Sequence, residues 1–278
     1  MKFQKMHGLG NDFILLEGVD PLKIDLPALA VKLCDRRQGI GADGIILILP
    51  SVLADVRMRI LNSDGSEADM CGNGIRCFAK YVYESKQTSS KSFTIETGAG
   101  IMIPEVIVED EKVLFVKVNM GAPSLNRDAI PMIGNTGDVI DELFHVNERE
   151  FKITSMLMGV PHTMVFVDDL DHTDIITLGR GIEKHPRFPK GTNVNFIEVI
   201  NDGEIKVRTW ERGAGSTLAC GTGSCAAAVA SALNGKTKKE VCVHLALGDL
   251  YIEWVDGNVF MTGPAEHVFE GEFELNFK

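Results

Sequence analysis

Two cysteine motifs of the same design constrain the fold of this chain more than any other feature of its sequence. Residues 70–83 read MCGNGIRCFAKYVY, and residues 210–228 read WERGAGSTLACGTGSCAAA. Each motif contains the pattern C-G-x-G followed by apolar residues at helical spacing. Because the glycines allow a tight turn, the patterns predict two helices, one beginning just after Cys71 and the other just after Cys220.

The two motifs belong to a longer internal repeat. Asn11 and His162 are 151 residues apart, and Cys71 and Cys220 are 149 apart. Arg57 and Arg208 keep the same spacing of 151 residues, as do the apolar runs 45–48 and 196–199. A repeat of this length predicts two copies of one structural unit within the chain.

Several segments of the first copy have clear strand or helix patterns. Asp25 is typical of a helix N-cap, with Pro27 in the first turn of the helix that follows. Apolar or alternating patterns predict strands at residues 3–6, 12–16, 45–49, 56–61, 92–96, 100–108 and 112–119. Residues 269–277 alternate like a strand, and we expect them to return to the first domain.

These patterns predict an α/β chain of the α+β type with two similar domains related by a pseudo-two-fold axis. Each domain is expected to be a mostly antiparallel sheet or barrel around a central helix, because the strands come in runs and the helices are few. Breaks at 121–123 and 262–264 set the predicted domains at 1–120 plus 264–278, and 121–263. We expect the active site in the cleft between them.

Composition excludes several classes of partner. The chain has 278 residues with 39 acidic and 28 basic side chains, a net charge of −11. That charge disfavours nucleic acid and anionic membrane surfaces, no apolar run approaches membrane-spanning length, and a small-molecule substrate is the better expectation. Six cysteines are too few for a disulfide scaffold in a chain this long, so reduced thiols in the cytoplasm are expected.

A glycine pattern that resembles a nucleotide-binding motif has the wrong context. Gly39, Gly41 and Gly44 form G-x-G-x-x-G, but this run precedes the apolar strand at 45–49. A dinucleotide fingerprint follows a strand and opens a helix. We therefore do not predict a nucleotide site.

The placement of the two cysteines indicates proton transfer at carbon. Unpaired N–H groups at a helix N-terminus stabilise a thiolate, which predicts lowered pKa values for Cys71 and Cys220. The same N–H groups can bind a carboxylate. Two thiols on opposite walls of a cleft suit racemisation or epimerisation, in which one thiolate removes a proton and the opposite thiol returns one.

The chain resembles the diaminopimelate epimerase family. The motifs that carry the resemblance are HGLGNDF (7–13), NSDGSEADMCGNGIRC (62–77), MGVPH (158–162), GTNVNF (191–196) and ERGAGSTLACGTG (211–223). The resemblance implies an enzyme without cofactor or metal that interconverts LL- and meso-diaminopimelate. That reaction serves the synthesis of lysine and of peptidoglycan precursors, and family members are typically cytoplasmic homodimers.

The resemblance also implies a role for each motif residue. Cys71 and Cys220 would be the acid/base pair, assisted by His162 and Glu211. Glu211 is also expected to contact substrate. The residues expected to bind substrate are, through backbone groups at the two helix starts, Gly72, Asn73, Gly221 and Thr222, and through their side chains Asn11, Asn62, Asn193 and Arg212.

Three positions depart from the family pattern. Val160 replaces a substrate-contacting Asn found in many members, Ser216 replaces a Glu, and Gly44 lies where some members have a Gln. None of these changes affects the two cysteines, so they concern the substrate more than the chemistry.

Two alternatives remain open from the sequence. The first is a racemase of another amino acid on the same scaffold, working without pyridoxal phosphate because no lysine lies within either cysteine motif core. The second is a zinc-stabilised structural or binding protein. It would use four thiolates, Cys71, Cys77, Cys220 and Cys225.

Overall fold

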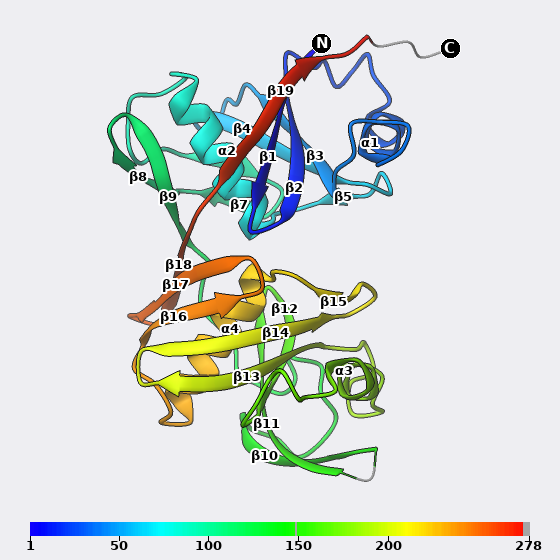
Figure 1. The fold of residues 1–278 in the computed structure, drawn as a ribbon, viewed down its shortest axis with the longest axis vertical. Coiled ribbons are helices and arrows are strands. Elements are labelled where there is room, and N and C mark those ends of the chain that lie inside the picture. Colours follow the sequence, from blue (N-terminus) through cyan, green and yellow to red (C-terminus); the bar gives the residue numbers. More distant parts are fainter. Residues whose placement is uncertain (148, 275–278) are drawn as a thin grey trace. The chain divides into compact units, whose positions relative to one another are not determined.

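The computed structural model describes residues 1–147 and 149–274, and its chain divides into two compact units. Unit 1 comprises residues 1–118 and 263–278, and unit 2 comprises residues 119–262 (Figure 1). The predicted domain limits differ from these by one or two residues. The predicted strand at 269–277 extends beyond the described residues, and residues 269–272 of it belong to a strand that pairs with the first strand of unit 1.

The described part of unit 1 contains two helices, a sheet of short strands and the separate β8–β9 hairpin. In chain order these elements are β1 (Lys2–Gly8), β2 (Asn11–Glu17), α1 (Leu26–Cys34), β3 (Gly44–Leu49), β4 (Val56–Asn62), β5 (Glu67–Ala68), α2 (Gly72–Glu84), β6 (Ile95–Thr97), β7 (Gly100–Met102), β8 (Glu105–Glu109), β9 (Lys112–Asn119) and β19 (Glu266–Glu272).

Unit 2 has the same kinds of element, but the strand that matches β19 in the sheet order comes first in this unit. They are β10 (Val139–Val146), β11 (Arg149–Met158), β12 (Val160–Phe166), α3 (Ile175–Glu183), β13 (Asn193–Asn201), β14 (Glu204–Glu211), β15 (Gly215–Thr217), α4 (Gly221–Leu233), β16 (Glu240–Leu245), β17 (Gly248–Val255) and β18 (Asn258–Gly263).

The sheet topology confirms that the chain is an internal repeat. In unit 1 the strand order is β19-β1-β2-β3-β4-β6-β7, with β5 paired to β4. In unit 2 the strands β10-β11-β12-β13-β14-β16-β17 match it strand for strand, with β15 paired to β14 and β18 added beside β17. Two pairs are parallel in each unit, β2–β3 and β4–β6 in one and β12–β13 and β14–β16 in the other. The other pairs within this order are antiparallel, as the sequence predicted.

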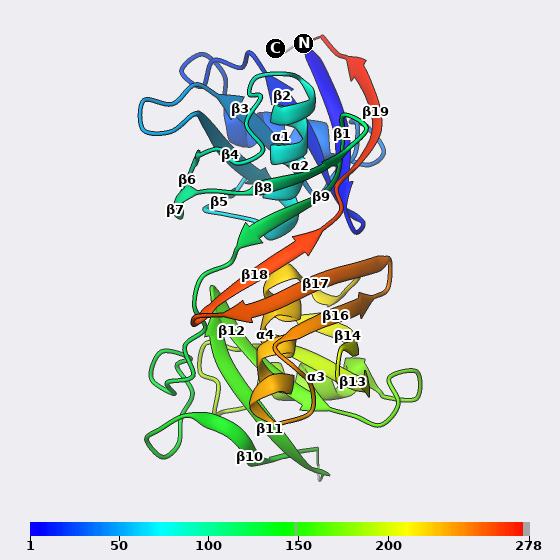
Figure 2. The ribbon, with the colours of Figure 1, turned by 90° about the vertical axis from the view of Figure 1, so that its left-hand side faces the viewer.

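Each sheet is covered by one helix on each of its two faces. The α2 helix lies against β1 to β4 and the β8–β9 hairpin, and α4 lies against the strands from β11 to β17 (Figure 2). On the opposite face, α1 packs on β3 and β4, and α3 packs on β13 and β14. All six residues of β3, GIILIL, are buried for this reason. A strand covered on both faces has a continuous apolar sequence instead of an alternating one.

The α4 helix differs from its predicted pattern. The sequence indicated one apolar face, but every residue from Gly221 to Ser231 except Thr222 is buried. Alanines 226, 227, 228 and 230 are at most 3% exposed, and their small side chains allow the sheet to wrap closely around the helix. The helix is therefore enclosed on nearly all sides.

The prediction of one continuous strand at 100–108 is wrong. The structure has two strands, β7 and β8, which are separated at Ile103 and Pro104. Proline has no backbone N–H to donate to a sheet, so the ladder ends at this point. The β8–β9 hairpin then packs on α2, where Lys80 Nζ donates to the carbonyl of Val113 at 2.9 Å.

A charged cluster fixes the start of β2 beside the loop that leads into β3. Asp12 accepts two hydrogen bonds from Arg36, at 2.7 and 3.0 Å, and pairs with Lys5 Nζ at 2.8 Å. The Lys5 and Asp12 side chains are only 7% and 14% exposed. Burial opposes ionisation of Asp12, but hydrogen bonds from Arg36 and Lys5 outweigh it and hold the pKa of this carboxyl well below its usual range.

Within the described residues, no helix is both long enough and apolar enough to cross a membrane.

Replacing Asp12 should destabilise unit 1. We expect Asp12→Asn to lower the free energy of unfolding by about 3 kcal/mol, because the buried ammonium of Lys5 loses its carboxylate and keeps only the carbonyl of Gly41. Urea denaturation at pH 7 measures the change. The matched control is Asp20→Asn, whose partner Lys23 is 79% exposed, and it should leave the unfolding midpoint unchanged.

The contribution of Asp12 should also depend on pH. Its folded pKa lies below the unfolded value near 3.8, so its stabilisation is present above about pH 4 and is lost as pH falls further. The stabilities of wild type and Asp12→Asn should therefore converge below pH 4. Curves that stay parallel from pH 7 to pH 3 would contradict this assignment.

Candidate active site

In unit 1, Cys71 occupies the N-cap of α2, as the sequence predicted. Its backbone is extended, with φ −138° and ψ 122°, and its Sγ accepts the N–H of Gly74 at 3.5 Å. The thiol in turn donates to Oδ1 of Asn11, at 3.6 Å. Asn11 begins β2, so the thiol links the start of the central helix to a neighbouring strand.

The orientation of Asn11 is set by two further contacts. Its Nδ2 donates to Oδ2 of Asp43 at 2.8 Å, which turns Oδ1 towards Cys71. The Nδ2 of Asn73, in the first turn of α2, donates to the same Oδ1 at 3.3 Å. Asn73 is only 5% exposed, and its own Oδ1 is buried with no hydrogen-bond partner among the described residues. The structure thus brings Asn11, Cys71, Gly72 and Asn73 together.

In unit 2, Cys220 occupies the N-cap of α4. The cysteine has an extended backbone, with φ −125° and ψ 108°, and is 6% exposed. Its Sγ lies 3.6 Å from Oγ1 of Thr222, and that hydroxyl lies 3.0 Å from Nε2 of His162. Gly221, Thr222 and His162 therefore all lie at this helix start.

The hydrogen bonds assign the tautomer of His162. Asn195 Nδ2 donates to Nδ1 of His162 at 3.1 Å, and Oδ1 of Asn195 accepts from Oγ1 of Thr209 at 3.0 Å. Because Nδ1 accepts, the proton is on Nε2, which donates to Thr222. The hydrogen of the Thr222 hydroxyl then points to Sγ of Cys220. The result is a directed chain of hydrogen bonds from Asn195 to the thiol.

His162 is neutral in this arrangement. The ring is completely buried, and burial lowers its pKa to about 3. It therefore cannot collect a proton from Cys220 near neutral pH. Its role at the thiol is to donate a hydrogen bond through Thr222.

The predicted lowering of the Cys220 pKa is wrong for this structure. Burial raises the pKa of the thiol, the carboxylate of Glu211 raises it further, and Thr222 only partly opposes these effects. Desolvation of a thiolate outweighs the partial charge at a helix N-terminus when the sulfur is this deeply buried. Cys220 is thus a protonated thiol.

The two thiol environments are equivalent positions of the repeat. In each unit the N-cap thiol contacts a residue of the second strand of the repeat, Asn11 directly and His162 through Thr222. Asn73 and Thr222 are both second residues of their helices, and each contacts the strand residue. The repeat therefore preserves the geometry of the site while the side chains differ.

Glu211 and Asn193 border the same helix start of unit 2. Glu211 accepts from Oγ1 of Thr217 at 2.6 Å, which orients its carboxylate. Asn193 is 8% exposed and accepts the backbone N–H of Arg212 at 2.8 Å, so it fixes the start of the loop after β14. On β13 it lies opposite His162 in the parallel register with β12.

Arg212 presents an exposed guanidinium on this loop. One guanidinium nitrogen donates to the carbonyl of Lys190 at 2.7 Å. Among the described residues no carboxylate pairs with Arg212, so the structural salt bridge that would be its simplest role is not present there. A guanidinium held by one backbone contact can still bind a carboxylate with its remaining donors.

Asn62 is placed in a turn at the end of β4. Its side-chain Nδ2 donates to Oγ of Ser66 at 2.9 Å, and its backbone carbonyl accepts the N–H of Gly65. The side chain is exposed. No hydrogen bond links it to Cys71 or Asn11 in the described part of unit 1, so the structure does not itself gather it with the thiol.

Sequence reasoning missed Asn195 and Arg76. Asn195 is completely buried and orients His162, and its position two residues after Asn193 in GTNVNF is the signal that could have identified it. Arg76 is also completely buried, and it donates to the carbonyls of Gly72 and Pro264, both at 3.0 Å. Its guanidinium therefore anchors the start of α2 below Cys71.

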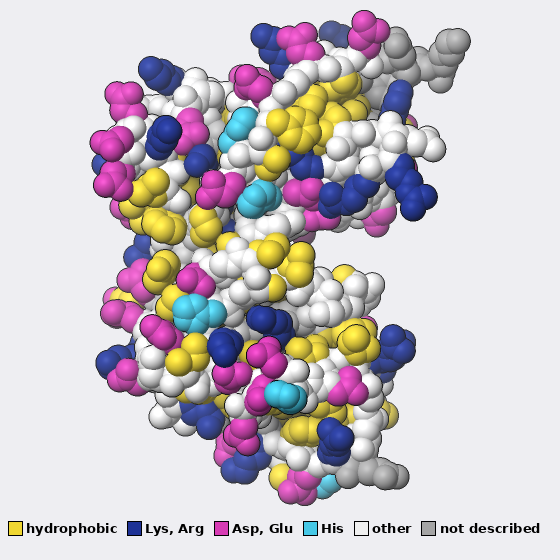
Figure 3. Space-filling model, in the orientation of Figure 1, with side chains coloured by type: hydrophobic (Ala, Val, Ile, Leu, Met, Phe, Trp, Pro, Cys, Tyr) yellow, Lys and Arg dark blue, Asp and Glu magenta, His cyan; other side chains and the backbone are white. Residues whose placement is uncertain are grey.

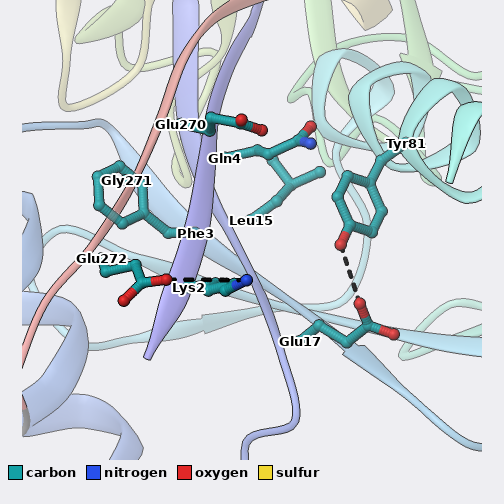
Figure 4. A pocket seen from close by; sticks show the side chains of 9 residues that line it. All are labelled: Lys2, Phe3, Gln4, Leu15, Glu17, Tyr81, Glu270, Gly271 and Glu272. Atoms are coloured by element: carbon teal, nitrogen blue, oxygen red, sulfur yellow. Dashed lines mark hydrogen bonds and ion pairs between the residues drawn. The ribbon is translucent and has the colours of Figure 1, made fainter.

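A hollow elsewhere on unit 1 does not have the properties of this site. It encloses about 410 Å³ beside β1, β2, β19 and Tyr81. Tyr81 is hydrogen-bonded to Glu17 at 3.0 Å, and Lys2 forms an ion pair with Glu272 at 3.7 Å (Figure 4). None of the predicted catalytic or binding residues lines it, and it contains no cysteine or histidine.

The predicted alternative of a four-cysteine zinc site is not supported. Cys77 is completely buried inside α2, and burial raises its pKa to about 12. A zinc ligand must be a thiolate, so Cys77 is a poor candidate.

Comparison with solved structures identifies the class of fold. The chain aligns with a probable proline racemase of Agrobacterium radiobacter K84 at a TM-score of 0.70 and 18% identity, covering 99% of this chain and 93% of that one. It aligns with a methylitaconate-delta-isomerase at a TM-score of 0.65 and 16% identity, covering 98% and 95%. The chain therefore has a fold found in several isomerases.

Comparison with sequences identifies the family within that class. The model of the diaminopimelate epimerase family matches residues 3–126 and 154–268. A diaminopimelate epimerase of Moorella thermoacetica is 54% identical over 279 residues, which cover 99% of this chain and 100% of the relative. Another, of Pelotomaculum thermopropionicum, is 55% identical over 278 residues, covering 98% and 99%. The chain belongs to the diaminopimelate epimerase family and is an isomerase.

Gly223 should not tolerate a side chain. A Cβ there would lie 2.4 Å from Oδ1 of Asn195, which is buried and bonded on both sides. The overpacking cost of about 1–3 kcal/mol exceeds the gain in helix propensity of about 0.5–1 kcal/mol. We expect Gly223→Ala to lower the free energy of unfolding by about 1 kcal/mol in urea denaturation.

Gly203→Ala is the control for this substitution. A Cβ at Gly203 meets its nearest neighbour, Oδ1 of Asn201, at an ordinary 3.6 Å. Its unfolding free energy should change by less than about 0.5 kcal/mol. A Gly223→Ala protein as stable as wild type would show that Asn195 is not held in place.

His162 should remain neutral throughout the physiological pH range. With a folded pKa of about 3, its imidazole should show no titration between pH 8 and pH 5 in NMR spectra, with His162→Gln used for assignment. His172 is the internal control, because its exposed ring is hydrogen-bonded to Asp169 and its pKa is raised above 6.5. A His162 midpoint near 6.5 would contradict the neutral tautomer assigned above.

Proposed function

We propose that this protein interconverts LL- and meso-diaminopimelate, with Cys71 and Cys220 as the acid/base pair. The observation that carries the proposal is the duplicated arrangement of an N-capping thiol at the start of each central helix. The relatives described above are named diaminopimelate epimerases, and both cysteine motifs lie within the matched residues. The reaction would serve lysine and peptidoglycan precursor synthesis.

The protonation state of Cys220 assigns a direction to the first turnover. Cys220 begins as a thiol, because burial and Glu211 raise its pKa. In the first turnover Cys71 therefore first releases to solvent the proton that it donates to Asn11, and its thiolate then removes the α-proton. The carbanion then takes the proton of Cys220 on its opposite face. Cys71 ends as a thiol and Cys220 as a thiolate, and the reverse reaction exchanges these roles.

The hydrogen-bond chain stabilises the thiolate that forms at Cys220. His162 donates to Thr222, whose hydroxyl is directed at Sγ 3.6 Å away. Because His162 is neutral, it contributes a dipole and takes up no proton. The proton transfers therefore involve only the two cysteines and the substrate. Asn11 has the corresponding position at Cys71, where its Oδ1 accepts from the thiol.

The helix starts supply the binding groups for the reacting carboxylate. Backbone N–H groups of Gly72, Asn73, Gly221 and Thr222 lie in the first turns of α2 and α4, where N–H groups have no acceptor within the helix. These donors, fixed before substrate binds, stabilise the charge that develops as the Cα–H bond breaks. The mechanism requires no metal or cofactor.

The distal amino-acid end of the substrate needs a separate set of groups. Arg212 has donors available for a carboxylate, and Asn193 fixes its backbone. We assign Asn11, Asn62, Asn193, Glu211 and Arg212 to substrate binding on this basis and on the family motifs. Val160 is 38% exposed at the start of β12 and offers no hydrogen bond there, so another amino acid remains the alternative substrate.

The decisive experiment is isotope incorporation during isomer conversion. The protein is incubated with LL-diaminopimelate in D2O without added cofactor, and a panel of L-amino acids is tested in parallel. We expect meso-diaminopimelate with one deuterium at the inverted Cα. Conversion of another amino acid in preference to LL-diaminopimelate would replace the proposed substrate but keep the two-thiol chemistry.

Substitution of the cysteines tests the mechanism. Cys71→Ser and Cys220→Ser should each lower kcat by about 10²–10⁴-fold, the usual range for loss of a general acid or base. Cys242→Ser is the matched control, since this cysteine lies on β16 outside the site, and should convert substrate at the wild-type rate. Near-normal turnover in either catalytic variant would refute the two-thiol mechanism.

The proposal includes a homodimer in the cytoplasm, with no nucleic-acid or membrane partner. The net charge of −11 supports the absence of polyanionic partners. Light scattering after size exclusion measures the mass, and about twice 30.4 kDa is expected.

A further inference from the structure

A mixed cluster of metal-ligand residues lies on unit 2 outside the proposed active site. Within the described residues, Cys242, His244 and Asp249 form the one group of three whose ligand atoms all lie within 4.8 Å of one another. We propose that these three side chains bind a divalent transition metal, of which zinc fits best, with solvent in the remaining position. The cluster is independent of the function proposed above.

The sheet register explains why these residues converge. Cys242 and His244 are two residues apart on β16 and therefore point to the same face. Asp249 on β17 is directly opposite His244, and Glu204 on β14 is directly opposite Cys242. Three adjacent strands thus place a thiol, an imidazole and two carboxylates on one face.

The ligand atoms lie close enough together for small movements to bring them onto one metal ion. Nδ1 of His244 lies 2.8 Å from Oδ1 of Asp249, and Nε2 lies 3.9 Å from Oε2 of Glu204. The second contact is to the other ring nitrogen of His244, so Glu204 adds negative charge beside the cluster without supplying a ligand atom. Tetrahedral zinc with bonds of about 2.0–2.3 Å separates neighbouring ligand atoms by about 3.3–3.8 Å, so adjustments of about 1 Å complete the site.

The charges around the thiol also favour a cation. Cys242 has two carboxylates beside it, Asp249 within the cluster and Glu204 opposite it on β14. Lys206 lies opposite His244 in the register, but it is paired with Glu198 on the other side of β14 at 2.9 Å and is drawn away from the cluster. A divalent cation would relieve the repulsion between the two carboxylates and stabilise the thiolate.

The ligand types select among metals. Sulfur and imidazole ligands suit zinc and related transition metals, whereas Mg²⁺ and Ca²⁺ require sites made of oxygen. The four side chains are only partly buried, so a metal can enter from solvent. Figure 3 shows a histidine with acidic side chains near it on the surface over β16.

The structure contains a natural comparison for this cluster. His172 and Asp169 form the same Nδ1-to-carboxylate contact, at 2.7 Å, but no cysteine belongs to that pair. If a histidine and carboxylate on the surface were sufficient for zinc, both places would bind it. The proposal requires the thiol of Cys242.

Calorimetric titration of the full chain with zinc chloride alone tests the site. We expect one zinc per chain at this cluster, and an affinity lowered at least about 100-fold in Cys242→Ser and His244→Ala. His172→Ala should bind as wild type does. Urea unfolding midpoints of the variants without metal show whether each is folded. If Cys242→Ser proves unfolded, Asp249→Asn replaces it.

Cobalt distinguishes this site from the catalytic cysteines. Co²⁺ bound to a thiolate gives a charge-transfer absorption, which should persist in the Cys71→Ser/Cys220→Ser double variant and disappear in Cys242→Ser. Zinc should also raise the Tm of wild type and leave that of Cys242→Ser unchanged. An absence of zinc binding, or binding unaltered by Cys242→Ser, would overturn the proposal.

Discussion

The structure depends on burying a helix start with a sulfur atom at its N-cap. Wrapping a sheet closely around α4 requires small side chains along the helix, and it places Cys220 and the first N–H groups in a region with little solvent. In that environment dipoles act strongly and ionisation of a thiol is costly. The packing that stabilises the core therefore also favours catalysis, because it holds the thiol and the helix N–H groups in position before charge develops.

Duplication supplies two such helix starts with different side chains around them. In unit 1 an amide, Asn11, accepts from Cys71, and Asp43 fixes its orientation. In unit 2 a neutral imidazole acts on Cys220 through the hydroxyl of Thr222. The Thr222 hydroxyl can therefore stabilise the thiolate that forms at Cys220, whereas Asn11 orients Cys71 by accepting its hydrogen bond. The repeat thus keeps the geometry while each copy surrounds its thiol with different hydrogen-bonding groups.

Much of this could be predicted from residue patterns. Periodicity and capping residues located α1, α2 and most strands of unit 1, and the recurring motifs predicted the duplicated topology, because such signals are local or repeat along the chain. The break at Pro104 and the full burial of α4 were missed, since both depend on partners distant in sequence. Asn195 was missed for the same reason, as its contact to His162 exists only when β12 and β13 pair.

The sequence by itself determined the family, the repeat, the capping positions of the two cysteines and the residue types of the site. Only the tertiary structure decided the proton states. Burial keeps His162 neutral, and burial with Glu211 keeps Cys220 protonated, against the expectation from its helix position. The tertiary structure also placed Cys242, His244, Asp249 and Glu204 on one face of the unit 2 sheet. The physical reason is that desolvation and strand register arise from the folded neighbourhood of a residue, which the order of residues along a chain does not display.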